Sequence, residues 1–339
     1  MSDHLNHTDR EYRFPITRIR RGGSKLLRRI RTVALIARLG RSSDILFVNG
    51  MALEAALVNL AIRKPMVLKI VGDLSWELAT LWGWTQDSFE DFQYRSHSGR
   101  LRILHSLQAW WTRRANKIIA NSGYMASWAI SWGASRENVV VVHNAAESID
   151  TNQPIQSPLK TSFKLVTVSR LVPWKKVDEI LSCISRIDGI GLIVIGDGPE
   201  KLSLERLATN LGLAQRVYFA GQRPRAETLS MMAGSDVFVL NSTWESFAHV
   251  ITEAMALGLP VLATPTGGSL EQIDDGQNGL LISPEHRSLT DAIRLLNTDS
   301  KLRKRLGQQG KATARDRFSI KEMVDKTEEV LMKACKVSN

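Results

Sequence analysis

Two glutamates separated by seven residues stand in the stretch Thr243-Trp244-Glu245-Ser246-Phe247-Ala248-His249-Val250-Ile251-Thr252-Glu253-Ala254-Met255-Ala256-Leu257-Gly258-Leu259-Pro260. Its apolar residues recur at helical spacing, and Ser246 is a good N-cap for that helix. The first N–H groups of the helix would then be free to bind an anion. The pattern predicts Glu245 just before a helix and Glu253 two turns into it. The pair could hold hydroxyls on both sides of a diphosphate, which is the shape of a nucleotide-sugar.

Four further segments accompany this stretch along the chain. They are Ser169-Arg170-Leu171-Val172-Pro173-Trp174-Lys175-Lys176, Val194-Ile195-Gly196-Asp197-Gly198-Pro199-Glu200, Val217-Tyr218-Phe219-Ala220-Gly221 and Pro265-Thr266-Gly267-Gly268. In this order and spacing, the five segments together resemble the signatures of the retaining glycosyltransferases of family 4, also described as glycosyl transferases group 1. The resemblance implies the GT-B fold, in which two Rossmann-like parallel-sheet domains face a central cleft.

The resemblance also implies roles for single residues. Glu253 would hold the ribose hydroxyls, and Glu245 would lie by the donor sugar and orient or stabilise the reacting ring. For His249, a positional role with a satisfied ring is favoured over a catalytic one. Glycines of the motifs would let the backbone approach the nucleotide. The implied donor-binding residues are Glu253, Ser246, Phe247, Ala248, His249, Gly196 and Gly221.

The phosphates must be held without a dinucleotide-binding loop, because no Gly-x-Gly-x-x-Gly follows a strand. Arg170 and Lys175 follow a predicted strand and can neutralise a diphosphate. The sequence contains no Asp-x-Asp, so we expect cationic side chains and helix N–H groups, without a metal or other cofactor, to stabilise the leaving group.

The N-terminal part departs from the family pattern in two places. Family members commonly show a His-Asp pair at the end of the strand that here ends Gly72-Asp73, so Gly72 replaces the His. Asp73 is expected either to contact the sugar, which is slightly favoured, or to cap the following helix. Family chains also usually open with a strand, a Gly-Gly loop and a helix, whereas Gly22-Gly23 follow no apolar strand. The N-terminal domain is therefore expected to lack that first unit.

Apolar runs alternate with helical patterns, as in parallel sheets covered on both faces. The expected strands are Asp44–Val48, Met66–Gly72, Lys117–Asn121, Val139–Val142, Lys164–Val168, Gly191–Ile195, Arg216–Ala220, Asp236–Leu240, Pro260–Ala263 and Gly279–Ile282. A polar, Pro-containing segment at Ser148–Thr161 is the expected linker. We expect an acceptor-side domain over residues 1–150, a nucleotide-sugar-binding domain over 160–318, and a helix crossing back over 319–339.

The formal net charge of +11 lies mostly in the N-terminal part, where residues 1–150 carry 21 Lys and Arg against 13 Asp and Glu. Within Arg18–Arg41, cations flank an apolar stripe at helical spacing, formed by Leu26, Leu27, Ile30, Val33, Ala34 and Ala37. Such a helix can bind anionic lipid headgroups or an anionic acceptor, or it can be an ordinary surface helix with a solvated basic face. Nucleic acid is not expected, because no aromatic-basic platform accompanies the charge.

Only two cysteines are present, Cys183 and Cys335, and no apolar run reaches the length of a membrane span. A cytoplasmic protein, or one peripheral on the inner face of the membrane, is expected.

The favoured function is transfer of a hexose, with mannose first, from a nucleotide-sugar to a glycan or lipid-linked acceptor in cell-envelope synthesis. A catalytically weak GT-B scaffold and a sugar-nucleotide epimerase of similar fold remain as alternatives.

Overall fold

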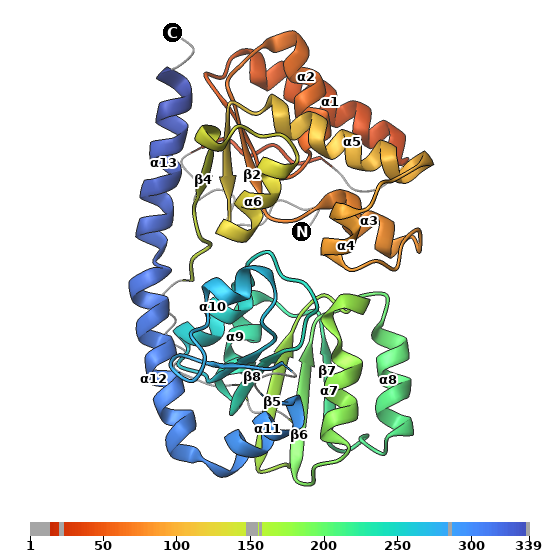
Figure 1. Cartoon of the computed structure of the whole chain (residues 1–339), viewed down its shortest axis with the longest axis vertical. Helices are drawn as coiled ribbons and strands as arrows, with labels where there is room; N and C mark the ends of the chain where they lie inside the picture. The colour runs from red at the N-terminus through yellow and green to blue at the C-terminus, as the bar shows by residue number, and fades with distance from the viewer. Residues whose placement is uncertain (1–13, 20–23, 147–154, 156–157, 284–286, 337–339) are drawn as a thin grey trace.

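The computed structural model describes residues 14–19, 24–146, 155, 158–283 and 287–336. Within them the chain forms two α/β units stacked one above the other, with a long helical segment running along one side of both (Figure 1). Most of the expected linker Ser148–Thr161 lies outside the described residues, and so does the pair Gly22-Gly23.

The N-terminal unit is built on a parallel sheet with strand order β1-β2-β3-β4. Its strands are β1 (Leu46–Val48), β2 (Met66–Ile70), β3 (Lys117–Ala120) and β4 (Val139–Val141). Its helices are α1 (Lys25–Arg41), α2 (Ala52–Ile62), α3 (Leu74–Leu81), α4 (Phe89–Tyr94), α5 (Gly99–Arg114) and α6 (Gly123–Ser131), followed by the 3-10 turn η2 (Arg136–Asn138). The loops after β2 and β3 face the second unit, which brings the carboxyl ends of these strands to the boundary between the units.

The C-terminal unit has a parallel sheet of order β10-β9-β8-β5-β6-β7. Its strands are β5 (Phe163–Val168), β6 (Ile190–Ile195), β7 (Val217–Gly221), β8 (Val237–Leu240), β9 (Val261–Ala263) and β10 (Leu280–Leu281). Its helices are α7 (Val177–Ile184), α8 (Lys201–Asn210), α9 (Arg225–Ala233), α10 (His249–Ala256), α11 (Leu289–Thr298) and α12 (Ser300–Arg317), with the 3-10 turns η3 (Pro173–Lys175) and η4 (Gly267–Glu271). All residues of β6 and β8 are buried, as expected for strands covered on both faces.

All ten expected strands are present, and their ends agree with the expected ends within two residues. The agreement follows from the continuous apolar runs, which must be buried on both faces of a parallel sheet.

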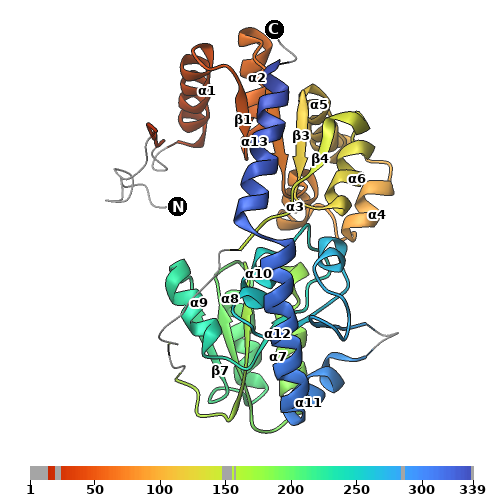
Figure 2. The same cartoon turned by 90° about the vertical axis from the view of Figure 1, so that its left-hand side faces the viewer.

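The C-terminal helix α13 (Ile320–Lys336) returns to the N-terminal sheet. Its residues Val330 and Ala334 share a buried cluster with Val67 and Ile119 from that sheet. The chain leaves α12 at Phe318, whose buried ring lies against His143 and Phe247. Figure 2 shows α12 and α13 running together along both units.

Helix α1 lies at the outer edge of the N-terminal unit and packs on α2 (Figure 2). Its buried residues are Thr32 and Gly40. Leu26, Leu27 and Ile30 are 67%, 55% and 55% exposed. An ordinary surface helix buries its apolar stripe against the protein, whereas the N-terminal end of the stripe of α1 is exposed. Among the described residues, no helix combines the length and apolar character needed to cross a bilayer.

Candidate active site

Glu245 lies in the loop between β8 and α10, where it is 7% exposed. Its carboxylate oxygen Oε1 lies 2.5 Å from the Lys175 ammonium nitrogen, so the two residues form an ion pair. The turn at Gly267 and Gly268 supports this loop. A Cβ on Gly267 would lie 2.1 Å from the Glu245 carbonyl oxygen, and the Gly268 N–H donates to that oxygen. The glycines are therefore required for the backbone contact that positions Glu245.

Arg170 and Lys175 both come from the segment after β5, at the carboxyl edge of the sheet. The buried indole of Trp174 anchors the segment, and its carbonyl accepts the N–H of Thr243. Arg170 is exposed, and none of the residues that the structure describes forms an ion pair or hydrogen bond with its guanidinium. The expected pair of cations is therefore at one rim with Glu245, with Lys175 paired and Arg170 open to an anion.

Glu253 projects from α10 and is half-buried. Its oxygen Oε1 lies 3.0 Å from the Arg225 guanidinium nitrogen Nε, at the start of α9. Sequence reasoning assigned no role to Arg225. The two residues are far apart in the sequence, so the pair becomes evident only from the position of α9 beside α10. A ribose hydroxyl bound by Glu253 would share the carboxylate with this cation.

The helix after Glu245 begins later than predicted, because its first residue is His249 and its N-cap is Ala248. Ser246 is therefore not the N-cap, and Glu253 lies one turn into the helix. Instead, the Ser246 hydroxyl donates to the Val71 carbonyl at 2.6 Å and accepts from Asn121 Nδ2 at 3.1 Å. The loop before the helix places this side chain against the other domain, so Ser246 joins the two units.

Only some of the backbone N–H groups at the start of α10, which the sequence predicts to bind an anion, lack an acceptor within the described protein. The Ala248 N–H donates to Gln272 Oε1 at 3.1 Å, which removes it from the set of donors available to a phosphate. The N–H groups of Phe247 and His249 have no acceptor among the described residues. Desolvation, together with Lys69 and Arg225, lowers the pKa of His249, which favours a neutral ring at pH 7.

Gly196 and Gly221 meet each other at the carboxyl ends of β6 and β7, where the Gly196 N–H donates to the Gly221 carbonyl. A Cβ on Gly196 would lie 1.9 Å from the Ser169 carbonyl oxygen. Contact between backbone segments therefore explains Gly196 without a ligand. The approach of a nucleotide to these glycines stays a prediction.

Asp73 is the N-cap of α3, and its side chain is not exposed. Its oxygen Oδ1 accepts from the N–H groups of Ser75 and Trp76 at the start of α3, and Oδ2 accepts from Gln93 at 2.6 Å. The residue is fully buried. The preference for a sugar contact by Asp73 is therefore corrected, because both carboxylate oxygens already accept hydrogen bonds within the protein.

Glu77, in the first turn of α3, was given no role from the sequence. It is half-buried, and this burial, followed by the negative charge of Asp73, raises its pKa to about 7. Arg170, Lys175 and Glu245 from the C-terminal unit also act on its charge. Glu77 thus faces the same site from the N-terminal side. The signal that could have found it is an acid in the first turn of the helix that follows a strand.

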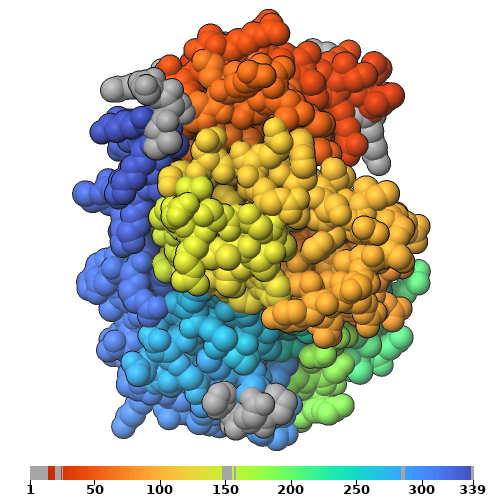
Figure 3. All heavy atoms as spheres, turned by 45° about the horizontal axis from the view of Figure 1, so that its top comes forward, coloured from red at the N-terminus to blue at the C-terminus, as the bar shows by residue number. Residues whose placement is uncertain are grey.

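Aromatic residues from both units meet beside these groups. The Trp76 ring lies 5.1 Å from both Trp174 and Trp244, and Phe89 lies 4.9 Å from Trp244. Glu271 of the C-terminal unit also contacts the N-terminal unit, because its carboxylate accepts from the N–H groups of Gly123 and Tyr124 at the start of α6. In Figure 3 the α6 region of the N-terminal unit, in yellow, lies directly against the C-terminal unit, in cyan. The two halves of the site are therefore held in contact.

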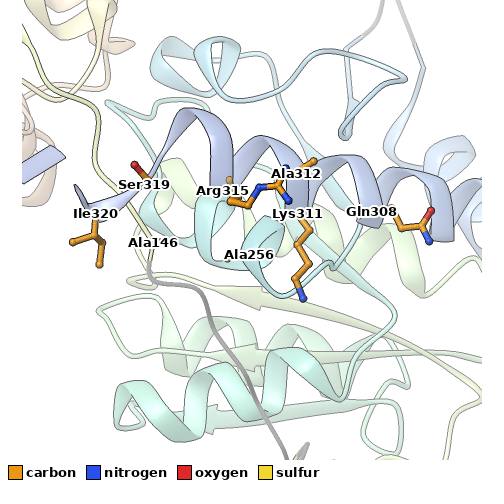
Figure 4. Close-up of a pocket in the computed structure, with 9 residues that line it drawn as sticks. Ala146, Ala256, Gln308, Lys311, Ala312, Arg315, Ser319 and Ile320 are labelled. Carbon is orange, nitrogen blue, oxygen red and sulfur yellow. The ribbon is translucent and has the colours of Figure 1, made fainter. Parts of the chain in front are cut away.

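A cavity of about 670 Å³ lies along α12 and includes Lys311, Arg315 and Ala146 in its lining (Figure 4). None of the predicted site residues lines this cavity. Within the described ranges, no group of three His, Cys, Asp or Glu side chains lies close enough to hold a metal ion.

The family models match this chain in two adjacent parts. "Glycosyltransferase Family 4" matches residues 3–148, and "Glycosyl transferases group 1" matches residues 148–313.

Curated relatives match over part of their length. The chain is 30% identical over 222 residues to the lipopolysaccharide core biosynthesis glycosyltransferase LpsE of Rhizobium meliloti, covering 63% of each protein. It is 30% identical over 166 residues to a GDP-mannose-dependent alpha-(1-6)-phosphatidylinositol monomannoside mannosyltransferase of Mycolicibacterium smegmatis, covering 45% of this chain and 44% of that protein. The matches thus span less than two thirds of these relatives.

Among solved structures, the chain is similar to HepE of Anabaena in complex with UDP-glucose. The TM-score is 0.73 at 25% identity, covering 89% of this chain and 82% of that one. Together with the two parallel sheets, this similarity confirms the GT-B fold.

Proposed function

Since the chain belongs to glycosyltransferase family 4, we propose that it transfers a hexose from a nucleotide-diphosphate sugar to a hydroxyl of a glycan or lipid-linked acceptor. The observation that carries this proposal is the ion pair of Lys175 with Glu245, 2.5 Å apart, at the rim that also holds Arg170. A cation and an acid at one rim can serve a leaving phosphate and a sugar ring together.

The reaction retains the configuration of the sugar carbon. The bond from that carbon to the phosphate oxygen breaks, and the acceptor oxygen bonds to the same face. The acceptor proton passes to the leaving phosphate oxygen, so a dedicated general base is not needed. Arg170 and Lys175 stabilise the negative charge that develops on the diphosphate, and no metal ion takes part.

The proposed donor is GDP-mannose, used in the synthesis of cell-envelope polysaccharide or glycolipid. Support comes from the names of the relatives, which include a GDP-mannose-dependent mannosyltransferase and a lipopolysaccharide core enzyme. The similarity to a structure that binds UDP-glucose makes this the second donor to test.

The exposed stripe of α1 supports a second part of the proposal, docking on an anionic membrane. Leu26, Leu27 and Ile30 are exposed beside the exposed cations Arg29 and Arg31. Apolar residues beside cations suit a surface of acyl chains and anionic headgroups. Such docking would bring the cleft close to a lipid-linked acceptor.

A nucleotide-release assay tests the transfer. GDP-mannose, UDP-glucose, UDP-galactose and UDP-N-acetylglucosamine are supplied singly, with a bacterial lipid extract as acceptor and with excess EDTA in a parallel series. We expect acceptor-dependent release from one donor, unchanged by EDTA. Loss of release in EDTA with recovery in magnesium would contradict the metal-free mechanism. Free-sugar epimers in place of a glycosylated product would favour the epimerase.

A further inference from the structure

A second cavity, of about 230 Å³, lies in the N-terminal unit at the carboxyl ends of β1 and β2. Its walls combine apolar and polar groups. The residues that carry the argument are Leu74 and Trp111 on the apolar side, and Lys69, Gln108 and Glu77 on the polar side. At about 30 Å³ per water, it holds the volume of roughly eight water molecules, which suits one small hydroxylated ring.

Gln108 lines this cavity. The residue is only 3% exposed, and its side-chain oxygen Oε1 has no hydrogen-bond partner within the described structure. A buried amide oxygen normally accepts a hydrogen bond, and leaving it unpaired costs free energy. Because Oε1 has less than 1 Å² of accessible surface, a ligand in the cavity does not reach it, and Gln108 contributes only to the cavity wall.

Glu77 has unused acceptors at the same place. Across the described parts of the chain, no side chain or backbone group donates a hydrogen bond to its carboxylate, and no cation lies within 4 Å of it. Asp73, one turn earlier, shows the contrast, because its oxygens accept from Ser75, Trp76 and Gln93. The fold therefore satisfies one of the two acids and leaves the other for a ligand.

The position of Glu77 ties the cavity to the site in the C-terminal unit. A Cβ on Gly72 would lie 2.8 Å from Glu77 Oε1 and 3.5 Å from the Trp244 ring. Trp244 directly precedes Glu245. The Glu77 carboxyl thus lies in the space that a side chain at Gly72 would fill, beside the loop that carries Glu245.

We propose that this cavity binds the hydroxylated ring of the acceptor, and that Glu77 fixes its orientation by accepting hydrogen bonds from its hydroxyls. The apolar wall at Leu74 and Trp111 contacts a ring face, while Lys69 can donate to a ring oxygen. This inference rests on the proposed function, and it assigns a substrate contact to an acid outside the nucleotide-binding motifs.

Direct binding tests the cavity without any reaction. Saturation-transfer NMR is run with the methyl glycosides of glucose, galactose, mannose and N-acetylglucosamine, on wild type, Glu77→Gln and Glu77→Ala. Glu137→Gln, an exposed glutamate of the same unit, is the control. We expect signal from at least one glycoside with wild type and the control, and a loss of most of that signal in both Glu77 variants. No signal with wild type, or equal signal in all proteins, overturns the proposal.

Kinetics separate this inference from the proposed function. Folding of each variant is checked by its affinity for GDP and UDP, which should match that of wild type. With the donor and acceptor that wild type uses, Glu77→Gln should raise the acceptor KM about 10-fold or more and change the donor KM less than about twofold. If wild type transfers sugar and the acceptor KM is unchanged in Glu77→Gln, the inference fails alone. If wild type transfers to no acceptor while the glycoside still depends on Glu77, the proposed function fails alone.

Discussion

The two halves of the molecule share one construction but expose different surfaces. In the C-terminal unit, six parallel strands carry the predicted motifs, and Arg170, Lys175 and Glu245 meet at one rim. The N-terminal unit has four strands and exposes apolar side chains, including Phe47 of β1 at 44% and Met51, directly before α2, at 61% exposure. We therefore propose that the C-terminal unit binds the nucleotide, and that the N-terminal unit offers surfaces suited to a less polar partner.

The contrast shows what a motif can encode. The motif glycines in the C-terminal unit support loops through backbone contacts, as Gly267 does for Glu245, so residue type and spacing are both constrained. The N-terminal unit acts through side chains around a cavity. Many combinations of acid, amide and apolar residues can line such a cavity, and spacing alone does not identify them.

The largest expected effect is on the C-terminal side, from Lys175→Met. The change removes a cation from the leaving phosphate and leaves Glu245 buried without its partner, so the transfer rate should fall about 10²–10³-fold. Single-turnover rates with the preferred donor measure this. Lys164→Met, in a half-buried lysine of the same sheet, is the control. An equal rate in Lys175→Met and wild type would remove Lys175 from the mechanism.

On the N-terminal side, membrane docking should depend on the cations of α1. Replacing Arg28, Arg29 and Arg31 by Ser should weaken binding to anionic vesicles by about 1 kcal/mol for each cation near the surface. Co-sedimentation with phosphatidylglycerol vesicles measures it, with phosphatidylcholine vesicles and high salt as controls. Equal binding to both vesicle types, or to neither, would leave α1 as an ordinary surface helix.

Glu253→Ala sharpens the assignment of the nucleotide to the C-terminal unit. Loss of a charge-assisted hydrogen bond to the ribose should weaken nucleotide binding by about 1.5–3 kcal/mol. Calorimetry with GDP and UDP measures the change. Because Arg225 lies 3.0 Å from Glu253, Arg225→Ala serves to separate the effect of the acid from that of its partner. Unchanged affinity in Glu253→Ala would refute its ribose contact.

Glu77→Gln should stabilise the protein without ligand as the pH rises. The raised pKa of Glu77, about 7 against 4.5, means that the folded protein keeps a proton that the unfolded chain releases between these values. The wild-type protein therefore loses folding stability as the pH rises from about 4.5 to about 7, and the neutral amide in Glu77→Gln avoids this loss. The gain should be about 1–3 kcal/mol above pH 7 and vanish near pH 4. Thermal unfolding of both proteins at pH 4 and pH 8 measures it, and an equal difference at both pH values would contradict the shifted pKa.

Much of the fold follows from the sequence alone. Apolar runs identified all ten strands, because strands of a parallel sheet covered by helices are near-continuously apolar. The helix start near Ser246 was wrong, since a residue type favoured at N-caps also serves other hydrogen bonds. Here, the Ser246 hydroxyl contacts Val71 and Asn121 across the domain boundary. A local propensity does not contain that long-range contact.

The rest of the site was hidden for a related reason. Arg225 and Glu77 take part in the site through the packing of helices and the contact between the units, which spacing along the chain does not report. Asp73 was misassigned because an acid at a strand end suits both a ligand contact and a helix cap. Only its bonds to Ser75 and Trp76 decide between them.

The most direct test of the two proposed binding roles is to measure the KM of the donor and the KM of the acceptor in Glu253→Ala and in Glu77→Gln. We expect Glu253→Ala to raise the donor KM and to leave the acceptor KM near that of wild type, and Glu77→Gln to raise the acceptor KM and to leave the donor KM near that of wild type. A rise in the same KM in both variants, or no change in either, would contradict a nucleotide held by the C-terminal unit and an acceptor held by the N-terminal one.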